Sequence, residues 1–298
     1  MTPFFYACVG ASYEVANYLI YVEKIDINYT PTGFSYSPLF LATFAKDINL
    51  IRIMLNAGAS IDVIEGNRFH RSSPIYQAIK SKNLEILELL LSRVNPLNVK
   101  DNNAFSPLMR SILLSKDAVH LIVQGKCDVN YQTPDGKTAL MLACKSKDLD
   151  IVKLLVENGA DMKMKGSNGQ TPVHWAVESG RIEILDYILD NGGDPLVVDN
   201  QGQTPAHLLV SCSPSEFIPI MTLLLNSGVD INAKSHRITV FNSLIANPGV
   251  NPEIIRFLLE NGASLDIKSM NGKTGYEIAQ VVAKGEVKKI IEEFIKNK

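Results

Sequence analysis

The chain has 298 residues, 46% of them hydrophobic, and a formal net charge of −2. This hydrophobic content is enough for a sizeable core, and a chain of this length ordinarily corresponds to about two domains. The near-neutral charge provides no broad attraction to nucleic acid or to an anionic membrane. No stretch has the roughly 18 consecutive apolar residues that a spanning helix needs. We therefore expect neither nucleic-acid binding nor membrane insertion.

The four cysteines are scattered along the chain and form no C-x-x-C pair; they are Cys8, Cys127, Cys144 and Cys212. This spacing is not typical of a disulfide framework or of a zinc site. The apolar N-terminus has no basic residues, so it makes a poor secretory signal. We expect buried free thiols in a reducing compartment and a cytoplasmic protein.

One short pattern recurs from end to end: Ser or Thr, usually Pro, an apolar residue, and often a small residue three places later. The copies begin near residues 2, 37, 73, 106, 138, 171, 204, 239 and 274. The steps between them lie between 32 and 36 residues. Such a period indicates a repeat protein, and it predicts a single domain over 1–298 with about nine repeats.

Each copy predicts the same local structure. The Ser or Thr caps a helix of about ten residues, and the proline occupies the first helical position. A second amphipathic helix follows, as in residues 149–156, and ends at a glycine such as Gly159. A turn with Asp-Gly or Asn-Gly comes next, as at Gly136 and Gly169. The predicted fold class is therefore all-α.

The residues Thr171-Pro172-Val173-His174-Trp175-Ala176 and Asn158-Gly159-Ala160-Asp161 resemble the signatures of the ankyrin repeat family. The resemblance covers nearly the whole chain and implies an ankyrin-repeat solenoid, with a helix-turn-helix and a hairpin turn in each repeat. It implies that His174 and His207 form structural hydrogen bonds between repeats. It also implies a concave binding surface, built from the turn tips and the exposed side of each first helix.

Some copies depart from the pattern. The copy at Ser106 lacks the His and the Ala, and we expect a short second helix that ends at Gln124-Gly125. The copy at Thr239 lacks both the proline and a glycine in its preceding turn. An insertion at 211–215 predicts a longer loop between two helices. We expect lower local stability around the copies at Thr204 and Thr239.

The two ends of the chain differ. The last helix, 285–298, is rich in Lys and Glu, as a solvent-facing cap requires. The N-terminus instead carries aromatic residues that we expect to be packed on something, namely Phe4, Phe5, Tyr6, Tyr13 and Tyr18. Either this first copy is a short apolar cap, or a preceding segment is missing.

No pattern in the sequence indicates catalysis or a cofactor. The five histidines are not paired at metal-ligand or catalytic spacing, and the chain contains no Gly-rich phosphate loop or nucleophile motif. An enzyme would need a convergent polar pocket, which the sequence does not reveal. We therefore expect a non-enzymatic protein without a cofactor or a metal.

The concave positions that the resemblance implies are apolar in the N-terminal half and polar from Thr138 onward. The predicted partner-binding residues are Phe34, Tyr36, Phe44, Phe69, His70, Phe105, Leu113 and Leu114. Exposed apolar patches and aromatic residues are typical of interaction sites. The alternative is that Phe34, Phe69 and Phe105 stack on each other as internal packing.

The sequence leaves three functional hypotheses. The first is a scaffold or adaptor that binds a peptide or helix of a partner protein between about Ser37 and Leu114. The second is a self-associating structural array with a dimer contact at the apolar N-terminus, around Phe4 and Phe5. The third is a host-directed effector that uses the same surface. The expected oligomeric state is a monomer or a weak dimer.

Overall fold

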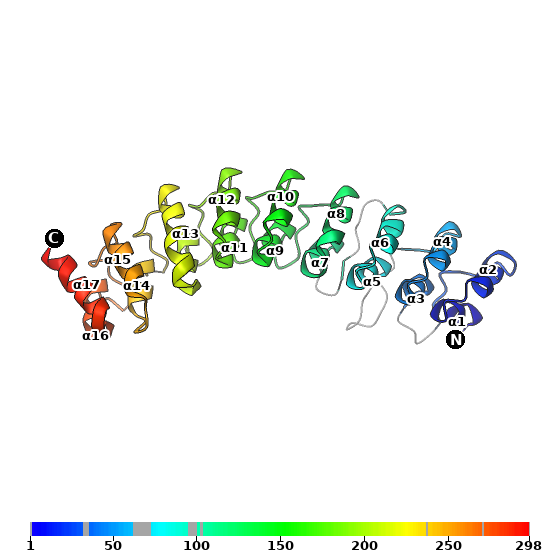
Figure 1. The fold of residues 1–298 in the computed structure, drawn as a ribbon, viewed down its shortest axis with the longest axis horizontal. Coiled ribbons are helices and arrows are strands. Elements are labelled where there is room, and N and C mark those ends of the chain that lie inside the picture. The colour runs from blue at the N-terminus through cyan, green and yellow to red at the C-terminus, as the bar shows by residue number, and fades with distance from the viewer. Residues whose placement is uncertain are drawn as a thin grey trace. The chain divides into compact units, whose positions relative to one another are not determined.

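The computed structural model describes residues 2–31, 36–61, 73–94, 100–101, 104–236, 238–269 and 271–297. These residues form the α-helices α1 to α17 and one 3₁₀-helix, η1, in a succession of helix pairs (Figure 1). They contain no strand and only two isolated β-bridges. The all-α fold class is therefore confirmed.

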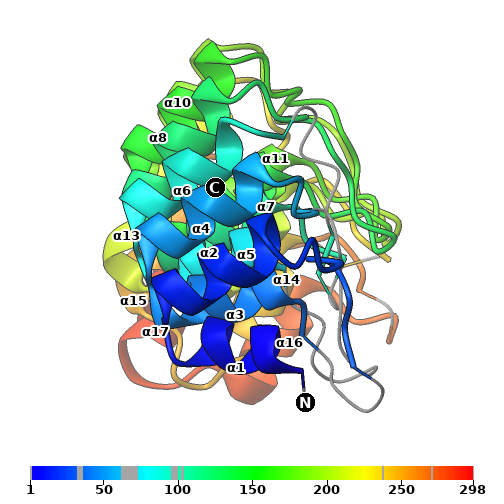
Figure 2. The ribbon, with the colours of Figure 1, turned by 90° about the vertical axis from the view of Figure 1, so that its right-hand side faces the viewer.

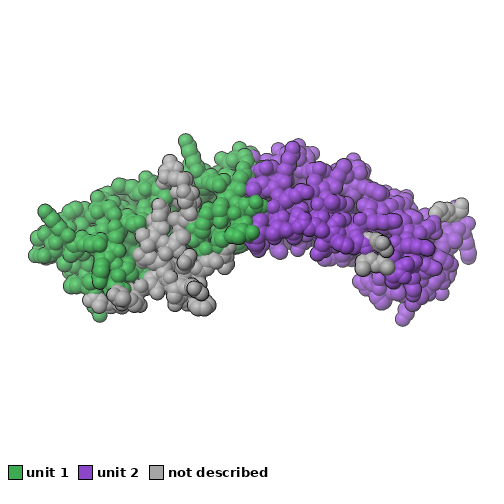
Figure 3. Space-filling view, turned by 180° about the vertical axis from the view of Figure 1, so that it is seen from behind, with its two compact units in different colours: residues 1–134, 157–160 green, residues 135–156, 161–298 purple. Residues whose placement is uncertain are grey.

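The chain groups into two compact units, coloured separately in Figure 3: unit 1 is residues 1–134 and 157–160, and unit 2 is residues 135–156 and 161–298. The helices of unit 1 are α1 (Pro3–Val9), α2 (Tyr13–Tyr21), α3 (Pro38–Ala45), α4 (Ile48–Asn56), α5 (Pro74–Lys80), α6 (Leu84–Leu91), α7 (Pro107–Leu114) and α8 (Lys116–Gln124).

Unit 2 continues the series of pairs. Its helices are α9 (Ala139–Ser146), α10 (Leu149–Glu157, whose last residue belongs to unit 1), α11 (Pro172–Ser179), α12 (Ile182–Asp190), η1 (Pro205–Ser211), α13 (Pro214–Asn226), α14 (Val240–Ile245), α15 (Pro252–Glu260), α16 (Gly275–Val282) and α17 (Gly285–Lys296). The description of the chain as one domain of nine repeats stays a prediction.

Within each unit the first helices of the pairs pack side by side, and so do the second helices. In unit 1, α1, α3, α5 and α7 form one layer, and α2, α4, α6 and α8 lie behind it (Figure 2). In unit 2, contacts run along α9, α11, η1, α14 and α16, and along α12, α13, α15 and α17. The core lies between the two layers, where Leu50, Ile79 and Leu87 are fully buried.

The predicted helix starts are confirmed by their caps. The hydroxyls of Thr2, Ser37, Ser73, Ser106 and Thr138 each accept a hydrogen bond from the backbone N–H three residues later. Four of these caps are followed by a proline at the first helical position. The first helices are shorter than the predicted ten residues, with six to eight residues in each.

The third helical residue of several first helices reaches the next helix pair. Nδ1 of His174 accepts a hydrogen bond from the N–H of Thr171 at 3.2 Å, so its Nε2 carries the proton toward the carbonyl of Gln203, also at 3.2 Å. His207 repeats this arrangement with Thr204 and with the carbonyl of Ile238. The structural role predicted for both histidines is therefore confirmed.

Two other residue types form the same bridge at the same position. Asn242, three residues after Thr239, donates from Nδ2 to the carbonyl of Ile267 at 3.0 Å. Tyr76, three residues after Ser73, donates its hydroxyl to the carbonyl of Phe105. A side-chain donor at this position thus connects neighbouring helix pairs, whether it belongs to His, Tyr or Asn.

Two predictions about helix lengths are wrong. Helix α8 is not short, because its nine residues equal those of α4, α10 and α12. The insertion at 211–215 forms no long loop, because only Cys212 and Ser213 separate η1 from α13. The added residues instead lengthen α13 to 13 residues, since Ser213 and Glu216 form a capping box around Pro214. The lower stability expected near Thr204 and Thr239 stays a prediction.

The aromatic residues of the N-terminus do not all pack inside. Phe4 and Phe5 are buried, whereas Tyr6, Tyr13 and Tyr18 are exposed, so the expectation of packing fails for the three tyrosines. At the other end, α17 buries Val287, Ile290 and Ile291 and exposes its charged side chains, as expected of a cap.

Two of the four thiols are less buried than expected: Cys8 and Cys144 are buried, while Cys127 and Cys212 are only half-buried. Burial raises the pKa of Cys8 and of Cys144 to about 12, which keeps both thiols protonated at neutral pH.

In the part of the chain that the structure describes, every helix is too short or too polar to cross a membrane.

The buried histidines predict a loss of stability in acid. Desolvation lowers the pKa of His174 and His207 below the value of about 6.5 that an unfolded chain has. Below about pH 6.5 the unfolded state therefore binds protons that the folded state does not, and the free energy of unfolding falls toward pH 5. Urea unfolding between about pH 7.5 and pH 5 measures this fall.

The matched variant is His174→Asn with His207→Asn, since Asn242 shows that an asparagine can form the bridge without titrating. Its free energy of unfolding should fall less than that of the wild type over the same pH range. An equal fall in the two proteins would contradict the assignment to these histidines.

Candidate functional site

One face of the first helices in unit 1 carries the exposed apolar residues. We call the fourth and seventh residues after each cap the first-helix row, because residues three apart lie on the same side of a helix. In unit 1 the row consists of Tyr6, Val9, Leu41, Phe44, Gln77, Lys80, Arg110 and Leu113.

Several members of the row leave large apolar areas open to solvent. Phe44 is 64% exposed and Leu113 is 47% exposed, and Tyr6 and Val9 are exposed as well; Leu114, which follows the row on α7, is also exposed. The α5 members of the row, Gln77 and Lys80, are polar and separate Phe44 from Leu113. Exposed apolar side chains on one face of a protein are typical of an interaction site. Phe44, Leu113 and Leu114 therefore lie where a partner could reach them.

The other predicted site residues are differently placed. Phe34, Phe69 and His70 lie outside the described residues, so the proposed stacking of the aromatic turn residues stays a prediction. Tyr36 is half-buried and stacks on Phe40, with ring centroids 4.5 Å apart. Its ring thus packs partly inside its own helix pair.

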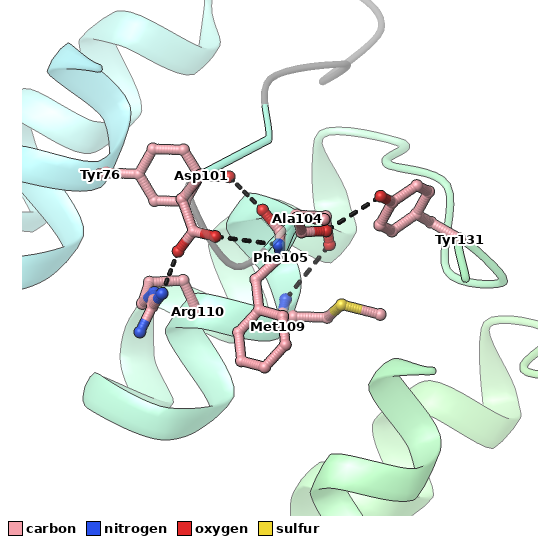
Figure 4. Close-up of polar contacts among 8 residues, drawn as sticks. Tyr76, Asp101, Ala104, Phe105, Met109, Arg110 and Tyr131 are labelled. Atoms are coloured by element: carbon pink, nitrogen blue, oxygen red, sulfur yellow. Dashed lines mark hydrogen bonds and ion pairs between the residues drawn. The ribbon is translucent and has the colours of Figure 1, made fainter. Parts of the chain in front are cut away.

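Phe105 ends a tight turn that Asp101 organises (Figure 4). The N–H of Asp101 donates to the carbonyl of Phe105 at 3.0 Å, and a carboxylate oxygen of Asp101 accepts from the N–H of Phe105 at 2.9 Å. The N–H of Ala104 also donates to the carbonyl of Asp101. Three hydrogen bonds therefore fix the backbone next to Phe105.

The second carboxylate oxygen of Asp101 pairs with the guanidinium of Arg110, a member of the first-helix row. Asp101 is almost fully buried and Arg110 is 24% exposed. The guanidinium carbon lies 5.2 Å from the ring centroid of Phe105, within the range of a cation–π contact. Asp101 thus orients both Arg110 and the turn that carries Phe105.

Two tyrosines attach this turn to its neighbours. Tyr76 of α5 donates to the carbonyl of Phe105, and Tyr131 donates to the carbonyl of Ala104 at 2.9 Å (Figure 4). Burial raises the pKa of Tyr76, so its phenol remains a proton donor at any physiological pH. Within unit 1 the turn is therefore connected to α5 through Tyr76 and to the loop after α8 through Tyr131.

The unit 2 positions that the sequence predicts to be polar are polar, and two pairs of them form ion pairs, but the seventh residue after Thr274 is the apolar Val281, which is 72% exposed. Lys145 lies 3.9 Å from the carboxylate of Glu178 and 5.3 Å from the ring centroid of Trp175. Lys137 lies 2.8 Å from a carboxylate oxygen of Asp135. The described residues of either unit contain no group of three or more His, Cys, Asp or Glu side chains that could hold a metal ion.

Tyr6, Val9 and Arg110 belong to the exposed face but are not among the residues predicted for it. Tyr6 was expected to pack inside, although Tyr6 and Val9 occupy the fourth and seventh positions after Thr2. Counting from the cap would have placed both beside Phe44. The role of Arg110 depends on its contact with Asp101 and has no comparable signal in the sequence.

The Asp101–Arg110 pair gives a stability prediction. Asp101→Asn removes the buried charge and leaves Arg110 without its carboxylate, so we expect a loss of about 2 kcal/mol in the free energy of unfolding, reduced by the partial exposure of Arg110. The matched control is Asp135→Asn, because Asp135 pairs with Lys137 at an exposed turn. Chemical denaturation should show less than about 0.5 kcal/mol for the control, and equal losses would contradict the structural role of Asp101.

Comparisons with known proteins agree with this architecture. The family model for ankyrin repeats in three copies matches residues 39–133, 114–199 and 163–235. An ankyrin repeat protein of Acanthamoeba polyphaga mimivirus is 27% identical over 138 residues, and the match covers 43% of this chain and 17% of that protein. The chain thus matches only about a sixth of the length of this curated relative.

Two solved structures have the same fold. The ankyrin repeat domain of human ASB11 matches with a TM-score of 0.64 and 23% identity, over 75% of this chain and 98% of that chain. The ankyrin repeat domain of Bcl-3, a member of the IkappaB protein family, matches with a TM-score of 0.64 and 19% identity, over 74% and 98%.

Ankyrin repeats are generally protein–protein interaction modules, and the proteins that contain them are typically non-enzymatic scaffolds. The matches of the family model together span residues 39 to 235, which is more than half of the chain. The same segment contains the capped helix pairs and the bridging histidines described above. The chain belongs to the ankyrin repeat family.

Proposed function

We propose that this protein is a scaffold or adaptor that binds a partner protein through the first-helix row of unit 1, on the surface expected to be concave. The observation that carries the proposal is the exposure of Phe44 and Leu113 at equivalent positions of two first helices. Full burial of such a side chain contributes about 1.5 to 3 kcal/mol. Two such anchors are enough to dominate a small interface.

The shape of the row suits an extended or helical segment of the partner. Its members project from successive parallel helices, so they form a strip and not a closed pocket. A helix that lies along such a strip presents apolar residues at intervals of three or four. Phe105, which is half-buried beside Arg110, would extend the contact, and Phe34 and Phe69 stay predicted members of it.

The proposal also includes the number of repeats, the cellular compartment and the absence of a cofactor. We propose about nine repeats in one cytoplasmic binding module without a cofactor; the free thiols support a reducing compartment. A host-directed effector would use the same surface, so the physical test is the same for both roles.

The first test removes the two anchors by Phe44→Ser and Leu113→Ser. Because both side chains are exposed, the double variant should fold with nearly unchanged stability and lose at least tenfold in affinity for its partner. The matched control is Leu196→Ser with Val198→Ser, which removes two exposed apolar residues from unit 2.

The measurement is quantitative affinity capture from the native cells, followed by binding assays with the purified partner. A partner retained by wild type and control but lost with the double variant supports the proposal. If the folded double variant retains every partner of the wild type, this face is not the binding site.

A second candidate function is self-association through the outer face of the first helix pair. Val15, the third residue of α2, is 47% exposed, whereas Leu50, the third residue of α4, is completely buried. Tyr18, Leu19 and Tyr29 line a mainly apolar pocket of about 460 Å³ on this face. A second copy could cover these residues.

Phe4 and Phe5 cannot form the predicted dimer contact, because both rings are buried within unit 1. The proposed contact is instead at the exposed Val15 and Tyr18. The test is therefore Val15→Lys with Tyr18→Lys. Analytical ultracentrifugation at two concentrations should show a mass above 32.8 kDa for the wild type at the higher concentration, and not for the variant. A wild-type monomer at both concentrations would contradict self-association.

A further inference from the structure

We infer that the partner segment bound by unit 1 is acidic as well as apolar. The inference rests on the proposed function and adds the charge of the partner to it. It comes from the distribution of charged residues on the first helices, which differs between the two units.

The first helices of unit 1 carry cations and no carboxylates. No Asp or Glu occurs in α1, α3, α5 or α7. Lys80 and Arg110 belong to the first-helix row, Lys46 follows α3 directly, and Lys82 lies two residues after the end of α5. The three lysines are exposed.

Lysines at these positions also have a local structural explanation. Lys46 caps the C-terminus of α3 in a left-handed conformation, and Lys82 has a positive φ after α5. Positive charge is favourable at the C-terminus of a helix because of the helix dipole. This explanation leaves the ammonium groups in solvent, so it is compatible with a second role in binding.

The nearby carboxylates Asp47 and Asp101 have hydrogen-bond or ion-pair partners other than these lysines. Asp47 accepts hydrogen bonds from the N–H groups of Asn49 and Leu50 and thus caps α4. Asp101 is buried and pairs with Arg110. Within the described residues, Lys46, Lys80 and Lys82 form no ion pair at all.

The carboxylates Glu14, Glu85 and Glu88 belong to the second helices α2 and α6, which form the layer behind the first helices. In unit 2, by contrast, the row contains its own counter-charge, because Lys145 lies 3.9 Å from Glu178. Among its described residues, unit 1 therefore carries three lysines without an ion pair, Lys46, Lys80 and Lys82, which form a cationic border at the C-terminal ends of α3 and α5.

A complementary segment would place apolar side chains over Phe44 and Leu113 and carboxylates toward Lys46, Lys80 and Lys82. Charges at the rim of an interface contribute to association rate and to specificity, and salt weakens them. The partner is thus an acidic amphipathic segment, and a basic one would be rejected by like charge.

The test uses a phage-displayed library of random peptides about 16 residues long, enough for about four helical turns, selected on the full chain. Two variants with the same change in net charge are compared. K46E/K80E/K82E reverses the border of unit 1, and K147E/K163E/K234E reverses three exposed lysines of unit 2. Selected peptides are synthesised and their affinities measured at low and high salt.

We expect peptides that require Phe44 and Leu113 to carry a net negative charge. Their affinity should fall about tenfold with the unit 1 reversal, change less than about twofold with the unit 2 reversal, and decrease with salt. Peptides that require Phe44 and Leu113 but are neutral or basic would overturn this inference and leave the proposed function intact. A selection that yields no peptide dependent on Phe44 and Leu113 would overturn both.

Discussion

The side chain at the third position of a first helix connects one helix pair to the next. His174, His207, Tyr76 and Asn242 each donate from this position to a carbonyl in the following loop. Because that carbonyl is partly buried, an unmade bond would leave an acceptor with reduced access to water. The bridge therefore fixes the spacing between neighbouring first helices, and the row of side chains on their exposed side depends on that spacing.

Hydrogen bonds between neighbouring repeats also hold the tight turns in place. In unit 1, Tyr76 and Tyr131 attach the turn of Asp101 and Phe105 to both neighbours. In unit 2, the N–H of Asn200 donates to the carbonyl of Asn168 at 2.9 Å, so successive turns bond directly to each other. A Cβ added at Gly169 would approach the nitrogen of Asn200 to 2.7 Å. Glycine is thus required there by close packing as well as by its φ of +81°.

The helix starts and caps were predicted correctly because each depends on residues that are close together in the sequence. Ser or Thr followed by Pro specifies a helix start within a few residues, so the helix pairs and their caps could be placed from the sequence alone. The capping box at Ser213 and Glu216 is an equally local signal, and it was overlooked because the segment was interpreted only as an insertion.

The remaining features depend on contacts between segments. Arg110 finds Asp101 only because a folded turn brings the two together, and Tyr76 replaces a histidine only because its hydroxyl reaches the next loop. Phe44 and Leu113 were predicted from their positions within the repeat, whereas the exposure of Val15 on α2 was not, since α2 packs on both α1 and α4. The position of each residue within its repeat therefore predicted much of the candidate face. It predicted neither the ion pair between Asp101 and Arg110 nor the exposed side of α2.

The junction between η1 and α13 shows where such a chain can change length. In unit 2, residues added to a connecting turn would have to preserve the hydrogen bond from Asn200 to Asn168 that joins neighbouring turns. At Cys212 and Ser213, by contrast, residues have been added on the opposite end of the helices, and they extend one helix beyond its neighbours without disturbing the bridge from His207. The junctions between first and second helices are therefore natural places for sequence growth, and suitable positions for inserting a fluorophore or an affinity tag.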